Sequence, residues 1–313
     1  MAFSGGKDSL ACLLALIDAG VDLSKVELWH HDIDGREGSS LMDWSCTRAY
    51  CKAIAVAFNV PIYFSWLEGG FEREMLRDKQ RKAATAYERP SGIIGRSGGD
   101  RGKLNTRLKF PQVSADLSVR WCSAYLKIDV MSAAITGQMR FEGIRTLVVT
   151  GERAEESSAR SKYAVFEPHR CDNRDGTRVQ RHIDHWRPVH GMSVRQVWQL
   201  IERYRVNPHP AYRAGFGRVS CQFCIFGNAN QCASARAISP ERFDKVSGYE
   251  SRFGVTIHRN ETFNQRADRG TPYPAEQSDI DACRSEEFNE PVILPDGAWK
   301  LPSGAFAESC GPI

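Results

Sequence analysis

The chain begins Met1-Ala2-Phe3-Ser4-Gly5-Gly6-Lys7-Asp8-Ser9, and a helical pattern of apolar residues follows directly. Glycine lets the backbone turn sharply and approach a ligand closely. A helix that begins here presents unpaired N–H groups and the positive end of its dipole to an anion. We therefore predict a phosphate-binding loop that consists of Ser4, Gly5, Gly6, Lys7, Asp8 and Ser9.

A simpler interpretation of this stretch is a Gly-Gly turn followed by a capped helix. That interpretation accounts for Asp8 or Ser9, but not for a lysine beside two glycines at a strand-to-helix junction. The spacing also differs from that of a Walker A loop. The string from Ser4 to Ser9 resembles instead the PP-loop of the ATP pyrophosphatase superfamily. This resemblance implies that ATP is bound with Mg²⁺, that Lys7 and Asp8 act at the phosphates, and that Asp8 or Asp32 helps to hold the ion.

Composition places the chain among ordinary soluble proteins, with 42% hydrophobic and 26% charged residues in 313. It contains no apolar run of about 18 residues, so we expect no membrane span. The loop at the very start leaves no room for a signal peptide, which predicts a cytoplasmic location. Ten cysteines in such a protein favour metal or redox chemistry over a disulfide framework.

Strand and helix patterns alternate in the front half of the chain. Strand-like runs at 26–31, 60–64 and 146–150 are separated by helical segments, one of them around 44–58. This alternation predicts an α/β fold with a mostly parallel twisted sheet and helices on both faces. Since ligands bind beyond the carboxyl ends of such strands, we expect the loop, Asp32 and Gly151 to share one cleft.

The composition and the hydrophobic periodicity of the sequence change near residue 190. We therefore predict a nucleotide-binding domain at 1–190 and a smaller, cysteine-containing C-terminal region at 191–313. The stretch from Arg73 to Lys109 contains eleven basic and four acidic residues, and its glycine-rich part at 91–102 is typical of a flexible insertion. The insertion either follows a phosphate backbone or is simply solvated, and a net charge of +4 alone does not indicate a nucleic-acid-binding protein.

A second motif follows the strand at 146–150. Guanidinium groups suit phosphate and sugar oxygens, so Arg153 and Arg160 are candidate catalytic residues. Glu156 and Ser157 lie between them and, with Gly151, are candidate nucleotide contacts. The alternative is a solvated helix start with Glu-to-Arg pairs.

The third motif is a cysteine cluster. Cys221 and Cys224 form a C-x-x-C pair, and Cys232 follows eight residues later. Three thiolates do not complete a four-coordinate site, so a fourth ligand is needed. Cys122, in Arg120-Trp121-Cys122, is the best candidate for it.

Taken together, these motifs resemble the phosphoadenosine-phosphosulfate reductase-like branch of the PP-loop superfamily. The resemblance also includes Trp186-Arg187-Pro188 and Asn207-Pro208-His209-Pro210-Ala211-Tyr212. It implies a fold like that of the adenine nucleotide α-hydrolases. The branch contains sulfonucleotide reductases and the sulfur-inserting proteins of DNA phosphorothioation (DndC-like and SspD-like). Some members carry a [4Fe-4S] cluster, which the four cysteines above would bind.

Among these members, an intact loop with Lys7 favours cleavage of ATP to AMP and pyrophosphate. The resemblance then implies a nucleic-acid acceptor that is activated for sulfur incorporation, and a cysteine desulfurase or sulfur-relay protein as partner. One alternative is a sulfonucleotide reductase, because Glu308-Ser309-Cys310-Gly311 looks loosely like the tail that carries the reductase nucleophile. Another alternative is a subunit that senses ATP without turnover.

Overall fold

The centre of the fold is a layer of parallel strands joined through the first residues of the chain. The computed structural model describes residues 1–38 and 40–307. Strand β1 (Leu28–Asp32) runs parallel to β2 (Ile62–Leu67), and β5 (Arg145–Val149) runs parallel to β7 (His182–Trp186). The extended segment 1–3 lies between the two pairs. Its Phe3 N–H donates to the Trp29 carbonyl at 2.8 Å, and its Ala2 N–H donates to the Val149 carbonyl at 2.9 Å.

Antiparallel strands complete both edges of this layer. β3 (Thr85–Tyr87) pairs with β2, and β4 (Gly95–Ser97) pairs with β3. At the other edge β6 (Phe166–Pro168) pairs with β7. The predicted α/β fold with a parallel sheet is thus confirmed, with antiparallel pairing confined to the edges.

The β3–β4 hairpin occupies the stretch that we expected to be a flexible insertion. Glycine-rich sequence predicted a loop over 91–102, but three residue pairs, from Thr85↔Ser97 to Tyr87↔Gly95, hold the two strands together. Backbone pairing with β3 includes Gly95 despite the low strand propensity of glycine. The insertion therefore adds an edge strand to the sheet, and the flexibility of its remaining residues stays a prediction.

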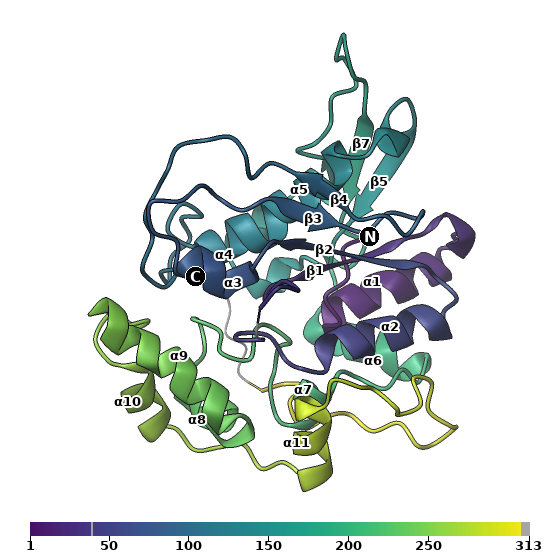
Figure 1. The fold of residues 1–313 in the computed structure, drawn as a ribbon. Helices are drawn as coiled ribbons and strands as arrows, with labels where there is room; N and C mark the ends of the chain where they lie inside the picture. The colour runs from purple at the N-terminus through teal and green to yellow at the C-terminus, as the bar shows by residue number, and fades with distance from the viewer. Residues whose placement is uncertain (39, 308–313) are drawn as a thin grey trace.

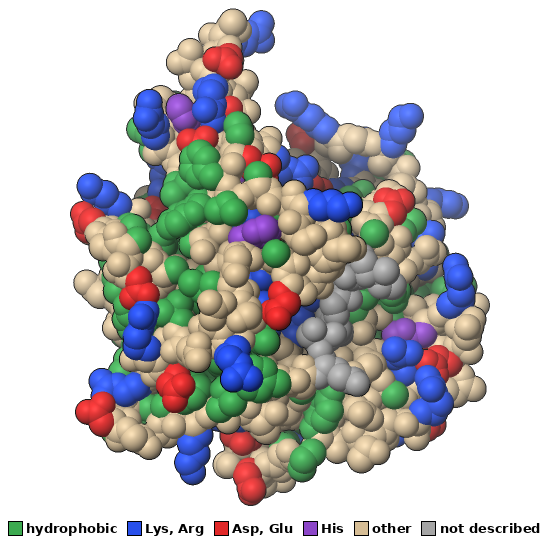
Figure 2. All heavy atoms as spheres, turned by 180° about the vertical axis from the view of Figure 1, so that it is seen from behind, with side chains coloured by type: hydrophobic (Ala, Val, Ile, Leu, Met, Phe, Trp, Pro, Cys, Tyr) green, Lys and Arg blue, Asp and Glu red, His purple; other side chains and the backbone are tan. Residues whose placement is uncertain are grey.

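Helices flank the sheet, with α1, α2 and α6 on one side and α4 and α5 on the other, while α8 to α11 form a separate group (Figure 1). None of the described helices is long and apolar enough to cross a membrane. Apolar side chains remain exposed on β5 and at the edge strand β6, among them Leu147, Val165 and Phe166. Figure 2 shows one face of the molecule, on which hydrophobic side chains gather at the surface. The helices are α1 (Lys7–Asp18), α2 (Thr47–Ala57), α3 (Gly70–Met75), α4 (Trp121–Ser123), α5 (Asp129–Thr136), α6 (Val194–Arg203), α7 (Pro210–Arg213), α8 (Ala229–Ile238), α9 (Pro240–Phe253), α10 (Phe263–Asp268) and α11 (Gln277–Arg284).

Two hydrophobic clusters form most of the core. In one, Leu13 of α1 belongs to the same group of buried side chains as Trp198 and Ile201 of α6. In the other, the aromatic rings of Phe223, Phe243 and Phe263 belong to the same group as Trp121. Since the first cluster contains residues from both sides of position 190, the division into 1–190 and 191–313 stays a prediction.

A buried ion-pair cluster anchors the insertion to the sheet. The Glu74 side chain at the end of α3 is fully buried, and its Oε1 lies 3.1 Å from Arg77 Nη2 and 2.8 Å from Arg107 Nη2. The Arg107 guanidinium also stacks on the Trp121 ring, 4.7 Å from the centroid. One carboxylate thus joins α3, the far end of the insertion and α4.

Glu74→Gln is expected to lower the free energy of unfolding by about 3 kcal/mol, because it leaves two guanidinium groups buried without their carboxylate. Urea denaturation followed by circular dichroism measures this loss. Glu241→Gln, at an exposed position in the first turn of α9, is the control and should change stability by less than about 0.5 kcal/mol. Equal effects of the two substitutions would show that the buried cluster does not anchor the insertion.

Candidate active site

The predicted phosphate loop forms the junction between segment 1–3 and α1. Gly6 is the N-cap residue of α1, and no side chain caps the helix there. Gly5 has φ +77°, a conformation that L side chains rarely adopt. A Cβ at Gly5 would also lie 3.1 Å from Cys51 Sγ and 3.2 Å from the Tyr50 ring of α2. The turn therefore requires glycine both for its backbone angles and for its close packing on α2.

Lys7 lies in the middle of a network at the start of α1. Its side chain is 4% exposed, and its Nζ lies 3.4 Å from Asp8 Oδ2. The same ammonium donates to the Gly217 carbonyl at 3.2 Å. The Lys7 backbone N–H donates to the Tyr212 hydroxyl at 2.8 Å. Lys7 is therefore held between its neighbour Asp8 and a segment more than 200 residues later.

Arg153 connects the loop to the end of β5. Its Nε donates to Asp8 Oδ1 at 2.6 Å, and its Nη1 donates to Glu155 Oε2 at 2.6 Å. Burial by itself would raise the pKa of the Asp8 carboxyl, but the positive charges of Lys7 and Arg153 outweigh it and the net pKa is lowered. Asp8 is therefore ionised at neutral pH, and one carboxylate bridges two cations.

Gly151 brings the end of β5 against the loop. A Cβ at this position would lie 2.7 Å from the carbonyl carbon and oxygen of Asp8, closer than real Cβ atoms approach. The expectation that the loop and Gly151 share one strand-end site agrees with this contact. The close approach explains why position 151, two residues after the end of β5, has no side chain.

The rest of the second motif shapes the turn after β5. Glu156 Oε2 accepts from the Arg153 N–H at 3.0 Å, and the Arg160 guanidinium pairs with the same carboxylate. Ser157 Oγ accepts from the Arg160 N–H at 3.2 Å. Arg153 thus reaches the loop, whereas Arg160 makes the Glu-to-Arg pair of the alternative interpretation. Among the described residues, the side-chain hydrogen bonds and ion pairs of Arg160, Glu156 and Ser157 are made within this turn and not with the loop.

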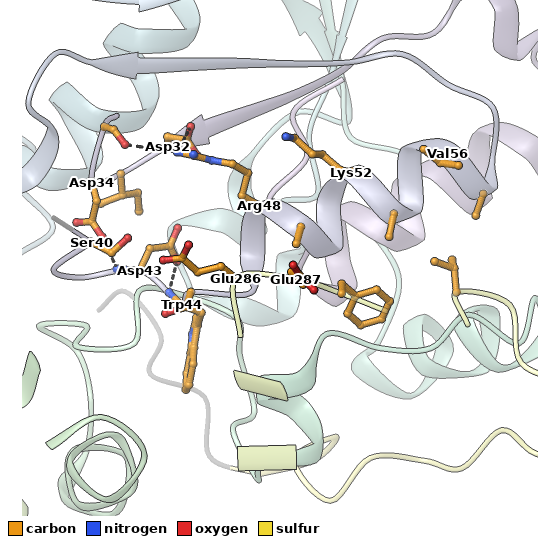
Figure 3. Close-up of a pocket in the computed structure, with 18 of the residues that line it drawn as sticks. Asp32, Asp34, Ser40, Asp43, Trp44, Arg48, Lys52, Val56, Glu286 and Glu287 are labelled. Carbon is orange, nitrogen blue, oxygen red and sulfur yellow. Dashed lines mark hydrogen bonds and ion pairs between the residues drawn. The ribbon is translucent and has the colours of Figure 1, made fainter. Parts of the chain in front are cut away.

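Asp32 ends β1 beside the loop but faces a different cavity. Its Oδ2 lies 2.9 Å from Arg48 Nη2 and 3.3 Å from Arg36 Nε. Figure 3 shows the cavity of about 740 Å³ into which this strand end opens, with Lys52 on α2 and the pair at 286–287 also in its wall. Within the part of the chain that the structure describes, no residue of the loop lines this cavity. The Asp32 carboxylate is thus paired with two guanidinium groups in the free protein. Its role as a Mg²⁺ ligand stays a prediction.

The four predicted cysteine ligands come from α4, α8 and the loop between α7 and α8, and they gather at one place. Burial raises the pKa of the Cys122 thiol to about 11 and that of Cys232 to about 12, and the nearby Cys224 raises both further. Burial also raises the pKa of Cys221, with contributions from Cys224 and Cys122. Among the described residues, however, no group of three or more His, Cys, Asp or Glu side chains has the arrangement of a metal site. The thiols are therefore neighbours without forming a ligand shell.

The sequence motifs did not reveal the segment at 217–219 that lies against the loop. Val219 faces Gly6, with 3.6 Å between its Cβ and the position of a Cβ on the glycine. The positive charge of Arg218 makes a small contribution to lowering the pKa of Asp8, after the larger effects of Lys7 and Arg153. The Trp44 indole N–H donates to the Ser220 carbonyl at 3.0 Å and holds the segment in position. Arg218, a cationic residue beside a glycine, was the feature of the sequence that could have indicated a phosphate contact. Nothing near it in the sequence relates it to the loop at 4–9.

Residues 207–212, which belong to the motifs of the family resemblance, pack against the loop and against α2. The buried His209 ring lies 3.7 Å from the position of a Cβ on Gly5. The Tyr50 hydroxyl donates to the Asn207 carbonyl at 2.9 Å. α7 begins with a proline at its first turn, and the His209 side chain caps it by accepting from the Ala211 N–H. This segment therefore fixes Tyr212, whose hydroxyl meets Lys7.

The family comparison concerns the middle of the chain. Residues 105–226 match the family model of the phosphoadenosine phosphosulfate reductase domain. Over this segment the chain is similar to that domain. The matched residues include Cys122, Arg153, Arg160 and the Cys221–Cys224 pair, whereas the loop at 4–9 and Cys232 lie outside the match. No curated protein shows a significant match to the chain.

This match supports the predicted likeness to the phosphoadenosine-phosphosulfate reductase-like branch. It does not distinguish proteins of DNA phosphorothioation from sulfonucleotide reductases. The choice between these activities therefore depends on the loop and its neighbours.

Gly151→Ala is expected to lower the free energy of unfolding by about 1–3 kcal/mol, because the new methyl group overlaps the Asp8 backbone. Chemical denaturation measures the loss. Gly191→Ala is the matched control, since a Cβ there meets nothing within 4 Å and the backbone conformation is an ordinary one. A Gly151→Ala protein as stable as the control would contradict the close contact between β5 and the loop.

Proposed function

We propose that this protein is an ATP pyrophosphatase that cleaves ATP to AMP and pyrophosphate and so activates an acceptor for sulfur incorporation. A nucleic acid is the acceptor that we infer, as in DNA phosphorothioation. The observation that carries the proposal is the joint contact of Lys7, Asp8 and Arg153 at a glycine turn that begins a helix. Cations, a helix N-terminus and a close-packed backbone together suit a polyphosphate.

The residues of the loop act by positioning and by neutralising charge. Lys7 and Arg153 share the charge of Asp8 in the free protein, so a triphosphate competes with that carboxylate for both cations. An oxygen of the acceptor would attack the α-phosphate while the bond between the α- and β-phosphates breaks, so that AMP stays on the acceptor until sulfur displaces it. Negative charge grows on the departing pyrophosphate, next to the start of α1 and Lys7. Mg²⁺ would further neutralise the phosphates, and Asp8 or Asp32, each of which is paired with two cations in the free protein, would help to hold it.

The position of the thiols supports sulfur chemistry at the activated acceptor. Segment 217–219 lies against the loop, and Cys221 follows two residues later. Cys221 is therefore close in sequence to a segment that contacts the proposed phosphate site. The sulfur itself comes from outside the chain, and we infer a cysteine desulfurase or a sulfur-relay protein as its donor.

Lys7→Ala is expected to reduce release of AMP and pyrophosphate from ATP by at least about a hundredfold, because the charge that faces the leaving group is lost. Chromatography of nucleotides and an enzymatic pyrophosphate assay measure the products. Lys25→Ala, which removes an exposed lysine that pairs only with Asp22 among the described contacts, is the control and should retain the activity. Unchanged turnover in the Lys7 variant would remove the loop from the mechanism, and binding of ATP without any turnover in the wild type would favour an ATP-sensing subunit.

The second candidate function is a sulfonucleotide reductase, the activity after which the matched domain is named. Production of sulfite from phosphoadenosine phosphosulfate and a reductant would support it. Cys310, the residue that the reductase interpretation makes the nucleophile, lies outside the described residues. Cys310→Ser should leave an ATP pyrophosphatase nearly unchanged and should abolish sulfite release by a reductase.

The four cysteines are proposed ligands of a [4Fe-4S] cluster, for which thiolates are the usual ligands. Protein purified without oxygen is expected to contain about four iron atoms per chain, measured by colorimetric iron assay and the visible spectrum. Cys224→Ser should lose most of this iron, because one of the four proposed thiolate ligands is replaced by a hydroxyl group. Cys12→Ala, at a buried cysteine of α1, should retain it. Stoichiometric zinc, or no metal at all, would contradict the cluster.

A further inference from the structure

A second cavity lies between the β3–β4 hairpin, α5 and the segment that precedes β7. Its volume is about 640 Å³. Its described lining residues include none from the loop at 4–9 and none from the cavity beside Asp32. It is therefore a separate site, and its walls come from parts of the chain far apart in sequence.

Basic side chains dominate this cavity. Lys82, Arg101, Arg170 and Arg181 line it, whereas the acidic side chains in its wall are Asp129 and Asp172. Both carboxylates already have cationic partners. Asp129 Oδ2 lies 2.6 Å from Lys82 Nζ, and Asp172 Oδ2 lies 2.8 Å from Nε of Arg174, which is outside the cavity wall. The three arginines therefore give the cavity an excess of positive charge.

Arg181 is the arginine whose surroundings point most clearly to a ligand. Its side chain is only 15% exposed, and its Nη1 lies 3.6 Å from Oε1 of its partner Glu142, which is a long ion pair. Its Nε is buried without a hydrogen-bond partner among the described residues. A cation that is largely removed from water and weakly paired is unfavourable unless an anion completes its hydrogen bonds. Arg101, which follows β4, is 92% exposed, and its ion pair with the exposed Asp100 is also long, at 3.8 Å, so its side chain can turn toward such an anion.

We propose that this cavity binds the phosphodiester groups of a single-stranded nucleic acid. The assignment to nucleic acid rests on the proposed function, whereas the need for an anion rests on the arginines alone. Guanidinium forks match the oxygens of a phosphate in pairs. A flexible single strand bends into a concave site, which a stiff duplex does not. The hairpin that was expected to be a flexible basic insertion supplies Arg101 and one wall of the cavity.

The test is fluorescence anisotropy of the full chain with a labelled single-stranded DNA of about twenty nucleotides, without ATP. Arg170→Ala/Arg181→Ala should weaken binding by about tenfold or more and reduce the salt dependence of log Kd by about 1.4, because two phosphate contacts are lost. Arg101→Ala, at an exposed position that the fold does not need, should weaken binding in the same direction. Arg252→Ala, on α9 and outside the cavity wall, is the matched control and should bind like the wild type.

Three outcomes would overturn the proposal. The first is equal affinity of the wild type and both arginine variants. The second is equal binding of a duplex of the same sequence. The third is displacement of the DNA by millimolar inorganic phosphate, which would assign the cavity to a free anion. Binding of DNA by the Lys7→Ala protein without ATP turnover in the wild type would contradict the proposed function alone and leave this site in place.

Discussion

The ion pair between Asp8 and Arg153 is the interaction on which the candidate site depends. It joins the first turn of α1 to the residues after β5, across 145 positions in the sequence, with 2.6 Å between Nε and Oδ1. The pair is possible only because Gly151 lets the end of β5 approach the Asp8 backbone. Because Asp8 also faces Lys7, the same carboxylate keeps two cations beside the glycine turn. Both cations are therefore in position before a polyphosphate binds, so the site is preorganised.

The second constraint is the contact between the loop and a segment that follows it by about 200 residues. The segment from Tyr212 to Val219 is hydrogen-bonded to Lys7 and packs on Gly6, and Cys221 follows it two residues later. The same stretch thus contacts the phosphate loop and precedes the first cysteine of the C-x-x-C pair. This connection is the physical reason to consider nucleotide activation and sulfur chemistry together.

The sequence predicted those features that short-range patterns determine. The glycine turn that begins α1 and the parallel strands follow from local motifs and spacing. The partners of the charged residues did not, because ion pairs such as Asp8 with Arg153 form between distant segments. Arg160 and Asp32 stay predicted nucleotide contacts, and in the free protein they pair with Glu156 and with two arginines of α2 and its preceding loop. Strand β4 lies inside the glycine-rich stretch for which the sequence predicted a loop, because its pairing with β3 depends on residues outside that stretch.

A crystal structure with α,β-methylene-ATP, whose scissile bond cannot be cleaved, tests the account most directly. The phosphates should lie against the backbone of residues 5–9, and Lys7 Nζ should leave the Gly217 carbonyl to contact them. A nucleotide bound elsewhere, with the hydrogen bond between Lys7 and Gly217 still intact, would contradict the assignment of this loop as the polyphosphate site.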